Sequence, residues 1–407
     1  MSKTELRYQV AKDVFAEVGV DTDAAMDLLD RIPISIHCWQ IDDLSGFEAP
    51  ERGLSGGIQA TGSDPSKAKT KEEFMRNLTK ALSLVPGKKK LALHAIYLDN
   101  LGAFVDRDAI EPKHFAFWVD YAKEHGLGLD FNPTYFSHKN ADSNFTLSSF
   151  DPSIRAFWIE HGKRCRRISD YLGRQLGQVC IDNHWIPDGY KDYTVDKLAH
   201  RELLADSMDR IMEEKLDCTV DSWESKLFGL GIESYTVGSH EFYMNYAMKH
   251  DNCMVCMDMG HFHPTEQISA KLTAFSVFGK DVMLHVSRPV RWDSDHVVIL
   301  DDELKEVMLE IARHRLFDTV HIGTDYFDGS INRIAAQALG PRSIKKALLY
   351  ALLEPTERLA AYEKAGDFTR RLAYCEEMKA LPFGLVWDMY CERCGVAGRD
   401  WVERVFQ

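Results

Sequence analysis

The segment "DVMLHVSRPVRWDSDHVV", residues 281–298, changes character within a few positions. Residues 281–288 contain the apolar run Val282, Met283 and Leu284, with Val286 shortly after, and are typical of a buried β-strand. Asp293, Asp295 and His296 then lie within four residues, before the apolar pattern resumes. Ligand-type side chains concentrated directly after a strand indicate a site at its end, so the fold depends on how many such strands the chain has.

Short apolar runs of this kind recur along the whole chain, and helical sequence separates nearly every pair. One such helix begins at Thr70 with Glu73 three residues later, a capping-box pattern, and another covers residues 152–173. The predicted strands are residues 32–39, 90–98, 127–134, 178–185, 219–228, 252–261, 281–288 and 318–327.

Eight strand-helix units between residue 32 and about residue 342 predict an α/β fold, the (β/α)8 TIM barrel, with a doubly wound sheet as the alternative. The first 19 residues read as an N-terminal amphipathic helix. We expect a catalytic barrel domain over 1–342 and a helical C-terminal arm over 343–407 that contacts another subunit. The long connections 40–68 and 228–240 are expected to be functional or to lie at an interface.

Composition limits the classes of partner. The formal charge is 49 minus 63, or −14, over 407 residues, which argues against general nucleic-acid binding and favours a small neutral ligand. No apolar stretch reaches the length of a membrane span, and the N-terminus does not resemble a signal peptide, so a cytoplasmic protein is expected. Nine scattered cysteines are expected to be reduced thiols.

Every predicted strand ends in a hydrogen-bonding or metal-ligand side chain. Barrel active sites form at the carboxyl ends of the strands, so these side chains should meet at one mouth. In chain order they are His37, His94, Asn132, Asn183, Glu224 with Lys226, Asp258 with His261, His285, and Asp325.

So many carboxylates and imidazoles at one mouth require a cation among them, and a divalent metal is the simplest one. His261, Asp293 and Asp295 suit an open site for Mn²⁺, Mg²⁺ or Zn²⁺. A second, closed site would draw on four strands and consist of Glu224, Asp258, His285 and Asp325. Arg288 and Arg291 are expected to orient the carboxylates of the loop rather than bind a phosphate.

Two other patterns are weaker. The CxxC pairs at Cys253 and Cys256 and at Cys391 and Cys394 lack zinc-finger spacing, and we read them as packing residues. The glycine-rich segment 53–62 lacks the Walker lysine and the GxGxxG spacing, so a flap over the mouth is expected.

At this level of detail the chain resembles the L-rhamnose isomerase family. The similarity extends from about residue 5 to the C-terminal arm. It is carried by "HCWQIDDLSGFE", "GGIQATG", "LHAIYL", "LDFNP", "WIPDG", "VDSWESKLFG", "ESYTVGS", "GHFHPTE", "LHVSRPVRWDSDHVV", "HIGTDYFD" and "INRIAA". Met259, Thr324 and His184 depart from the family pattern, and His184 is expected to affect sugar preference.

The resemblance implies a homotetramer of xylose-isomerase-type barrels that uses Mn²⁺ at two sites per subunit. It implies a catalytic metal on His261, Asp293 and Asp295, and a structural metal on the other four ligands, Glu224, Asp258, His285 and Asp325. The implied activity is aldose-ketose isomerisation of L-rhamnose to L-rhamnulose. The alternatives are another aldose on the same scaffold, or a barrel metallophosphoesterase.

The abundance of metal ligands favours a metal-assisted hydride shift between C1 and C2 over an enediol route. The expected catalytic residues are Lys226 as a donor to a substrate oxygen, His94 at the ring oxygen, and Asp325. Aromatic residues near the strand ends are expected to bind the deoxysugar methyl group. They are Tyr97, Phe131, Trp185 and Phe327.

Overall fold

A computed structural model describes residues 1–48, 54, 58–227 and 234–407. Eight parallel strands form a closed barrel in the order β1-β10-β9-β8-β6-β4-β3-β2. The predicted barrel is therefore confirmed, and the doubly wound alternative is wrong because that sheet would stay open. The barrel strands are β1 (Ile34–His37), β2 (Lys89–His94), β3 (Gly128–Asn132), β4 (Cys180–Trp185), β6 (Thr219–Glu224), β8 (Cys253–Asp258), β9 (Val282–Val286) and β10 (Val320–Thr324). The short strands β5 (Gly189–Tyr190) and β7 (Tyr235–Thr236) pair antiparallel outside the barrel.

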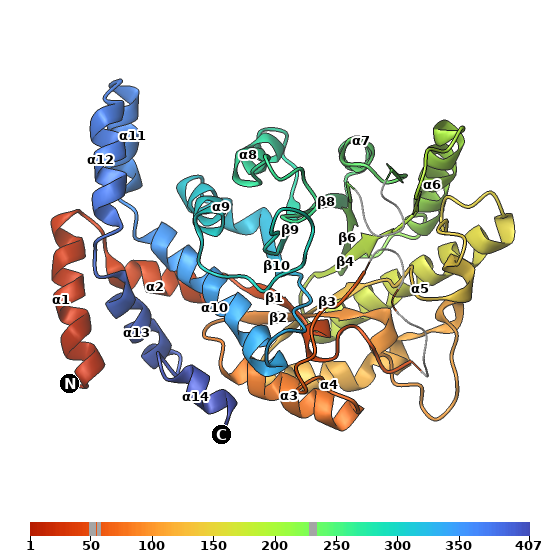
Figure 1. Cartoon of the computed structure of the whole chain (residues 1–407), viewed down its shortest axis with the longest axis horizontal. Coiled ribbons are helices and arrows are strands. Elements are labelled where there is room, and N and C mark those ends of the chain that lie inside the picture. The colour runs from red at the N-terminus through yellow and green to blue at the C-terminus, as the bar shows by residue number, and fades with distance from the viewer. Residues whose placement is uncertain (49–53, 55–57, 228–233) are drawn as a thin grey trace.

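Helices surround the barrel and extend beyond it (Figure 1). The α-helices are α1 (Lys3–Glu17), α2 (Thr22–Arg31), α3 (Lys71–Ser83), α4 (Ala116–His125), α5 (Pro152–Leu176), α6 (Lys197–Ile211), α7 (His240–Lys249), α8 (Ser269–Val277), α9 (Asp302–Arg313), α10 (Arg333–Leu352), α11 (Thr356–Lys364), α12 (Phe368–Met378), α13 (Phe383–Arg393) and α14 (Trp401–Val405). Short 3-10 helices are η1 (Trp39–Ile41), η2 (Ala95–Tyr97), η3 (Arg107–Ala109), η4 (Pro112–Phe115), η5 (Lys139–Ala141) and η6 (Leu316–Asp318).

The expected helix signals mark real boundaries. The Thr70 hydroxyl accepts a hydrogen bond from the Glu73 amide at 3.2 Å and begins α3. Asp151 caps α5, whose first residue is proline, and Gly177 ends α5 in the left-handed conformation that glycine adopts without strain.

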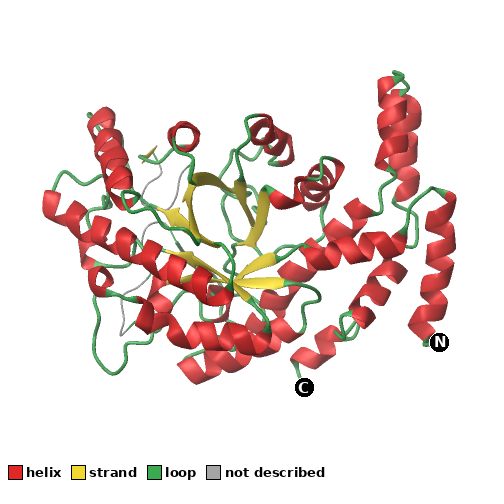
Figure 2. Ribbon diagram, turned by 180° about the vertical axis from the view of Figure 1, so that it is seen from behind, coloured by secondary structure: helices red, strands yellow, loops and turns green. Residues whose placement is uncertain are grey.

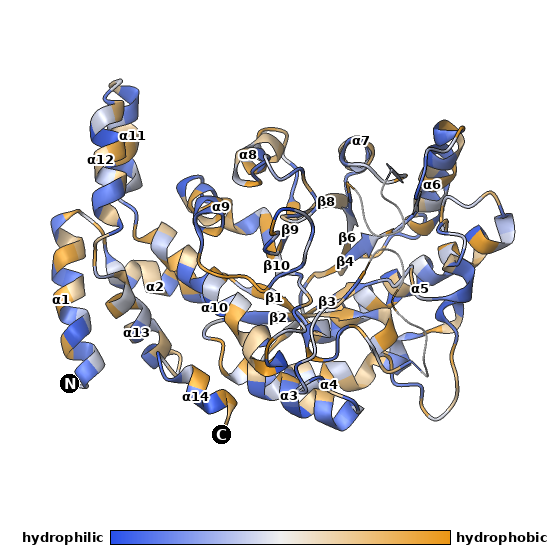
Figure 3. Ribbon diagram, in the orientation of Figure 1, coloured by the Kyte–Doolittle hydropathy of each residue, from blue (hydrophilic) through white to orange (hydrophobic). Residues whose placement is uncertain are grey.

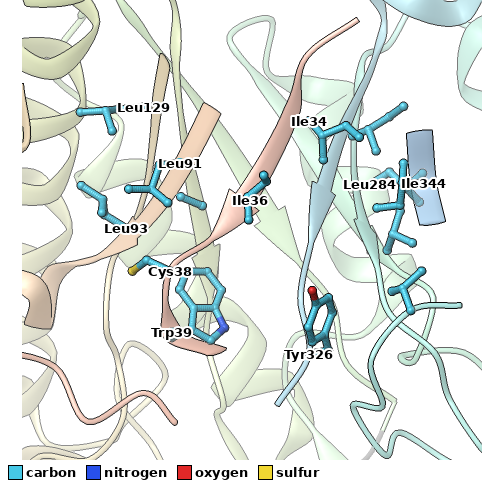
Figure 4. Close-up of a cluster of buried hydrophobic side chains, with 14 of the residues drawn as sticks. Ile34, Ile36, Cys38, Trp39, Leu91, Leu93, Leu129, Leu284, Tyr326 and Ile344 are labelled. Carbon is cyan, nitrogen blue, oxygen red and sulfur yellow. The ribbon is translucent and has the colours of Figure 1, made fainter. Parts of the chain in front are cut away.

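Successive strand residues face opposite sides of the barrel wall. One set packs outward against the helices, and Ile36, Leu91, Leu284 and Ile344 of α10 lie in this layer (Figure 4). The other set faces the interior, where Ile181, Met254, Cys256 and Met283 form a separate apolar cluster. Hydrophobic and hydrophilic residues alternate along the surrounding helices, as expected for helices with one covered face (Figure 3).

The C-terminal arm lies beside the barrel, where α1 packs against α13 (Figure 2). Helices α11 and α12 form a hairpin that projects from the body (Figure 1). The expected boundary between residues 342 and 343 falls inside α10. Arg342 there is buried and donates hydrogen bonds to the carbonyls of Leu84, Ala397 and Gly398. The helix thus joins barrel and arm, and the domain division stays a prediction.

The two long connections are described only in part. Residues 49–53 and 55–57 of the first, and 228–233 of the second, lie outside the described residues, so the predicted flap does too. Among the helices that are described, none combines the length and apolar character needed to span a membrane.

Candidate active site

Four ligand-type side chains from four strands converge at the carboxyl end of the barrel. Glu224 and Asp258 are the last residues of β6 and β8, His285 lies in β9, and Asp325 follows β10. His285 Nδ1 lies 3.3 Å from Glu224 Oε2, 3.7 Å from Asp325 Oδ2 and 3.9 Å from Asp258 Oδ2. The structure therefore brings together the four residues predicted for the closed site.

In both Asp258 and Asp325, hydrogen bonds hold one carboxylate oxygen in place, and the other oxygen faces His285. Asp258 Oδ1 accepts hydrogen bonds from the Gly260 amide at 2.6 Å and the Ser287 hydroxyl at 2.8 Å. Asp325 Oδ1 accepts one from the Trp39 indole at 2.9 Å. Neutral donors behind a ligand set orient the ligands before any ion binds.

A second group lies next to the first. Ligand atoms of Asp258, His261 and Asp293 lie within 4.8 Å of one another. His261 Nδ1 faces the Ser225 carbonyl at 2.9 Å, so this nitrogen carries the proton and Nε2 keeps its lone pair, 3.5 Å from Asp293 Oδ2. Glu224 Oε1 lies 3.3 Å from His261, which places this carboxylate between the two groups.

Asp295 lines a cavity at the mouth of the barrel together with Glu224 and His261, although it is not part of the group formed by Asp258, His261 and Asp293. Its φ of 47° places it in the left-handed region, which is strained for an aspartate and marks the turn of the loop. Arg288 Nε donates to the Val297 carbonyl at 2.9 Å and closes the base of this loop. Burial and the charge of Asp293 hold the pKa of Asp295 well above its usual range.

Lys226 is buried beside the loop, with Nζ 2.8 Å from Asp293 Oδ2 and 5.0 Å from the centre of the Trp185 ring. Burial opposes its charge, but the carboxylates of Asp293 and Asp295 outweigh burial and raise the pKa of Lys226. The lysine is therefore a permanent cation in an acidic mouth.

His94 lies on the opposite wall and is neutral. Burial lowers the pKa of His94 to about 3. Its Nδ1 contacts the Thr134 hydroxyl at 3.0 Å, and its ring packs edge-on against Trp39 at 4.6 Å between centroids. The Thr134 amide in turn donates to His161 at 2.9 Å, which fixes the position of the threonine.

The donor set fits a divalent cation. His285 Nδ1 and Asp293 Oδ1 are buried without a hydrogen-bond partner, and such orphan groups are costly unless something binds them. Burial raises the pKa of Asp258 well above its usual range, and the neighbouring charges of Glu224 and Asp325 add to this effect. These clusters of carboxylates and imidazoles are able to hold a metal ion, as predicted.

The two groups border a cavity at the mouth of the barrel. Trp185 and Phe327, two of the four aromatic residues expected at the mouth, line it. Sequence reasoning missed four further apolar residues of this wall, which are Trp39, Leu44, Ile58 and Phe136.

Tyr97 and Phe131, expected in the same wall, lie elsewhere. Tyr97 donates a hydrogen bond to buried Asp42 at 2.6 Å and packs against Phe47. Phe131 packs edge-on against Phe115 in the layer outside the barrel. The structure therefore corrects these two assignments, because both side chains turn into the core instead of the cavity.

His184 also turns away from the mouth. It lies buried outside the barrel wall, where its Nε2 is 3.2 Å from Asp221 and its Nδ1 contacts Tyr135 at 3.0 Å. Arg166 pairs with Asp221 at 2.8 Å and balances much of the negative charge there. The expected effect of His184 on sugar preference thus has no contact in the cavity to support it.

The cysteines form no disulfide among the residues that the structure describes. All nine are free, and Cys253, Cys256 and Cys391 are buried as packing residues. Cys256 lies within reach of Glu224 and His285 just below the mouth.

A closed parallel barrel with carboxylates, imidazoles and a buried lysine around a cavity at the carboxyl ends of its strands has the site arrangement of the TIM-barrel enzymes. Comparison with known sequences identifies the family within this class. The family model for L-rhamnose isomerase (RhaA) matches residues 2–407. The chain belongs to the L-rhamnose isomerase family, as its motifs predicted.

Relatives are similar over their whole length. L-rhamnose isomerase of Mannheimia succiniciproducens is 56% identical over 408 residues, covering 100% of this chain and 97% of the relative. The enzyme of the same name from Escherichia coli O157:H7 is 55% identical over 407 residues, covering 99% and 97%.

Among solved structures, an L-ribulose 3-epimerase matches with a TM-score of 0.48 at 13% identity, covering 81% of this chain and 96% of that chain. A D-psicose 3-epimerase from Clostridium cellulolyticum H10 matches with a TM-score of 0.49 at 15% identity, covering 79% and 99%.

Proposed function

We propose that the protein interconverts L-rhamnose and L-rhamnulose, an aldose-ketose isomerisation, and the name L-rhamnose isomerase that its relatives carry supports this proposal. The observation that carries the proposal is the set of side chains at the mouth of the barrel. Two adjoining groups of carboxylates and imidazoles face one cavity, together with a cationic lysine and a neutral histidine. The apolar wall of the cavity suits a sugar that carries a methyl group.

Two divalent ions, Mn²⁺ by resemblance, would occupy these groups. Glu224, Asp258, His285 and Asp325 would hold one, and His261, Asp293 and Asp295 the other. When bound, such ions polarise the sugar oxygens at C1 and C2 and so weaken the C–H bond that must break.

The protein side chains would bind and orient the substrate. Lys226 donates from a buried position where a sugar oxygen gains negative charge, which stabilises the transition state more than the ground state. Neutral His94 hydrogen-bonds the ring oxygen and assists ring opening. Asp325 lines the cavity and completes the ligand set.

The hydrogen moves between C1 and C2, and a hydride route is favoured. The carboxylates that line the described part of the cavity are Glu224, Asp295 and Asp325, and each belongs to a ligand set. None is left over as a base for the C2 proton. L-rhamnose deuterated at C2 should therefore transfer its label to C1 without exchange in H₂O, whereas an enediol route would wash the label out.

The first test is ketose formation from L-rhamnose after EDTA treatment, with and without added Mn²⁺. Activity should return with Mn²⁺ in the wild type and stay absent in an Asp293→Asn/Asp295→Asn double variant. An Asp192→Asn/Asp206→Asn variant changes the same charge at exposed positions and should behave like the wild type. Metal-independent turnover, or faster turnover of another aldose, would overturn the proposal.

The oligomer and the location are parts of the same proposal. We propose a cytoplasmic homotetramer in which the 343–407 arm contacts another subunit. Helix α12 has no buried residue, and its Phe368 and Leu372, four residues apart on one face, are 58% and 59% exposed, which leaves an apolar surface that another subunit would cover. Light scattering of the purified chain tests the subunit number.

A further inference from the structure

The first and last strands of the barrel, β1 and β10, pair only briefly, and side-chain hydrogen bonds continue this contact beyond the ends of the strands. The β1–β10 ladder has one register pair, Ser35 with Gly323. Beyond it, the Gln40 side chain exchanges two hydrogen bonds with the backbone of Asp328, at 2.9 Å and 2.8 Å. The segment 37–40 therefore continues the pairing to residue 328.

His37 fixes the residues on both sides of Asp325. Its Nε2 faces the Tyr326 carbonyl at 2.9 Å, so this nitrogen carries the proton, and Nδ1 accepts from the Thr324 hydroxyl at 2.6 Å. Burial lowers the pKa of His37 to about 3, so the ring is neutral, as this arrangement requires. The backbone before and after Asp325 is thus held by β1.

Trp39 holds the Asp325 carboxylate itself. The indole is 1% exposed, and its N–H donates to Oδ1 at 2.9 Å. An indole N–H can only donate, so this oxygen is committed to it. The other oxygen, Oδ2, faces His285 Nδ1 at 3.7 Å. The same indole packs on His94, so one side chain contacts two of the candidate catalytic residues.

We infer that Trp39 is a positioning residue, which orients Asp325 so that Oδ2 alone is presented to a cation in the closed site. The inference rests on the proposed function, in which Asp325 is a metal ligand. Without the indole donor, Asp325 is free to turn its half-buried carboxylate away from His285. Loss of an outer hydrogen-bond partner of this kind typically weakens metal binding about 10- to 100-fold.

A second tryptophan in the cavity wall, Trp185, provides a matched control for the Trp39 variant. Trp185 lines the same wall, and its buried indole N–H has no hydrogen-bond partner. Replacing either tryptophan by phenylalanine removes one indole N–H from the mouth. Only the Trp39→Phe change removes a hydrogen bond to a carboxylate.

The experiment measures Mn²⁺ binding to EDTA-treated protein by calorimetry in a His261→Gln background, which leaves the closed site as the candidate site. We expect Trp39→Phe to raise the Kd for Mn²⁺ at least about 10-fold and Trp185→Phe to change it less than about twofold. A Kd unchanged by Trp39→Phe would overturn the inference. No Mn²⁺ binding in the His261→Gln background itself would instead contradict the closed metal site and the proposed function.

A second variant covers the case in which Trp39→Phe does not fold. Trp39→3-benzothienylalanine keeps the shape of the double ring and replaces the N–H by sulfur. The same weakening of Mn²⁺ binding is expected. Binding equal to that of the Trp39 protein would show that the hydrogen bond has no positioning role.

Discussion

Lys226 Nζ lies 2.8 Å from Asp293 Oδ2, and both side chains are buried. A cation that binds Asp293 competes with this ion pair. The lysine is then free to donate to the substrate, so the pair links ion binding to the availability of Lys226.

Changing Lys226 to Met should distinguish a catalytic role, in which Lys226 donates to a sugar oxygen, from a role as the counter-ion of Asp293. If Lys226 stabilises developing charge on a sugar oxygen, kcat should fall about 10²- to 10³-fold, the usual cost of one such donor. The affinity for Mn²⁺ should stay equal or increase, because Asp293 loses a competing partner. Steady-state kinetics and calorimetry measure the two quantities.

Lys271→Met is the control for this change, since Lys271 pairs with Glu266 at a partly exposed position away from the cavity. A Lys226→Met protein that loses Mn²⁺ binding but keeps its kcat at saturating Mn²⁺ would contradict the catalytic role.

Mn²⁺ should stabilise the folded protein through the same ligands. Binding at about 100 times Kd contributes about 2.7 kcal/mol, which for a chain of this length corresponds to a rise in Tm of about 3 °C. Asp258→Asn should reduce the rise, because Asp258 is a proposed ligand of the closed site and its carboxylate also lies within 4.8 Å of the ligand atoms of His261 and Asp293. Thermal melts of EDTA-treated protein with and without Mn²⁺ measure it. An equal rise in the Asp258→Asn variant would argue against the closed site.

Side chains along a strand face the inside and the outside of the barrel in turn, and this alternation explains why much of the site could be predicted. Glu224, Asp258 and His285 lie at the carboxyl ends of their strands with inward parity, and apolar runs locate those strands without knowledge of the fold. The same alternation could have excluded Phe131, because its neighbour Asn132 belongs to the cavity wall. It could also have placed His184 outside, since Asn183 points inward to Glu224.

Other parts depend on contacts that no local pattern reveals. Tyr97 lies in η2, where strand parity no longer applies, and its partner Asp42 is 55 residues away in sequence. Trp39 and Asp325 are 286 residues apart. Their hydrogen bond exists because the first strand closes the barrel against the last. A tryptophan two residues after the strand-end His37 was the only available signal.

Sugar specificity should change when an apolar residue that lines the cavity is replaced. Phe136 packs against Trp185 and His94 at the cavity. Phe136→Tyr adds one hydroxyl there and should shift the ratio of kcat/KM for L-rhamnose over its 6-hydroxy analogue L-mannose about 10-fold toward L-mannose, within the roughly 1 to 3 kcal/mol of such discrimination. Competition between the two sugars measures the ratio.

Tyr97→Phe is the matched change outside the cavity and should leave the ratio as it is. A ratio that moves with Tyr97 and not with Phe136 would return Tyr97 to the substrate pocket and contradict the wall described here.

Lys345 in α10 should make stability depend on pH. Its ammonium group is fully buried and donates to the carbonyls of Leu29 and Ile32 at the end of α2. Burial lowers the pKa of Lys345 to about 7 from its ordinary 10.5. Between these values the unfolded chain binds a proton that the folded chain does not, so the free energy of unfolding rises with pH in this window.

The rise from pH 7 to pH 9 attributable to Lys345 should be roughly 2 to 3 kcal/mol. Lys345→Met should flatten the pH dependence by that amount, and Lys364→Met, at an exposed position of α11, should leave it as in the wild type. Urea unfolding at pH 7, 8 and 9 measures the three proteins. If the Lys345→Met and wild-type values run parallel across this range, Lys345 stays charged in the folded protein, and its hydrogen bonds to α2 compensate fully for its burial.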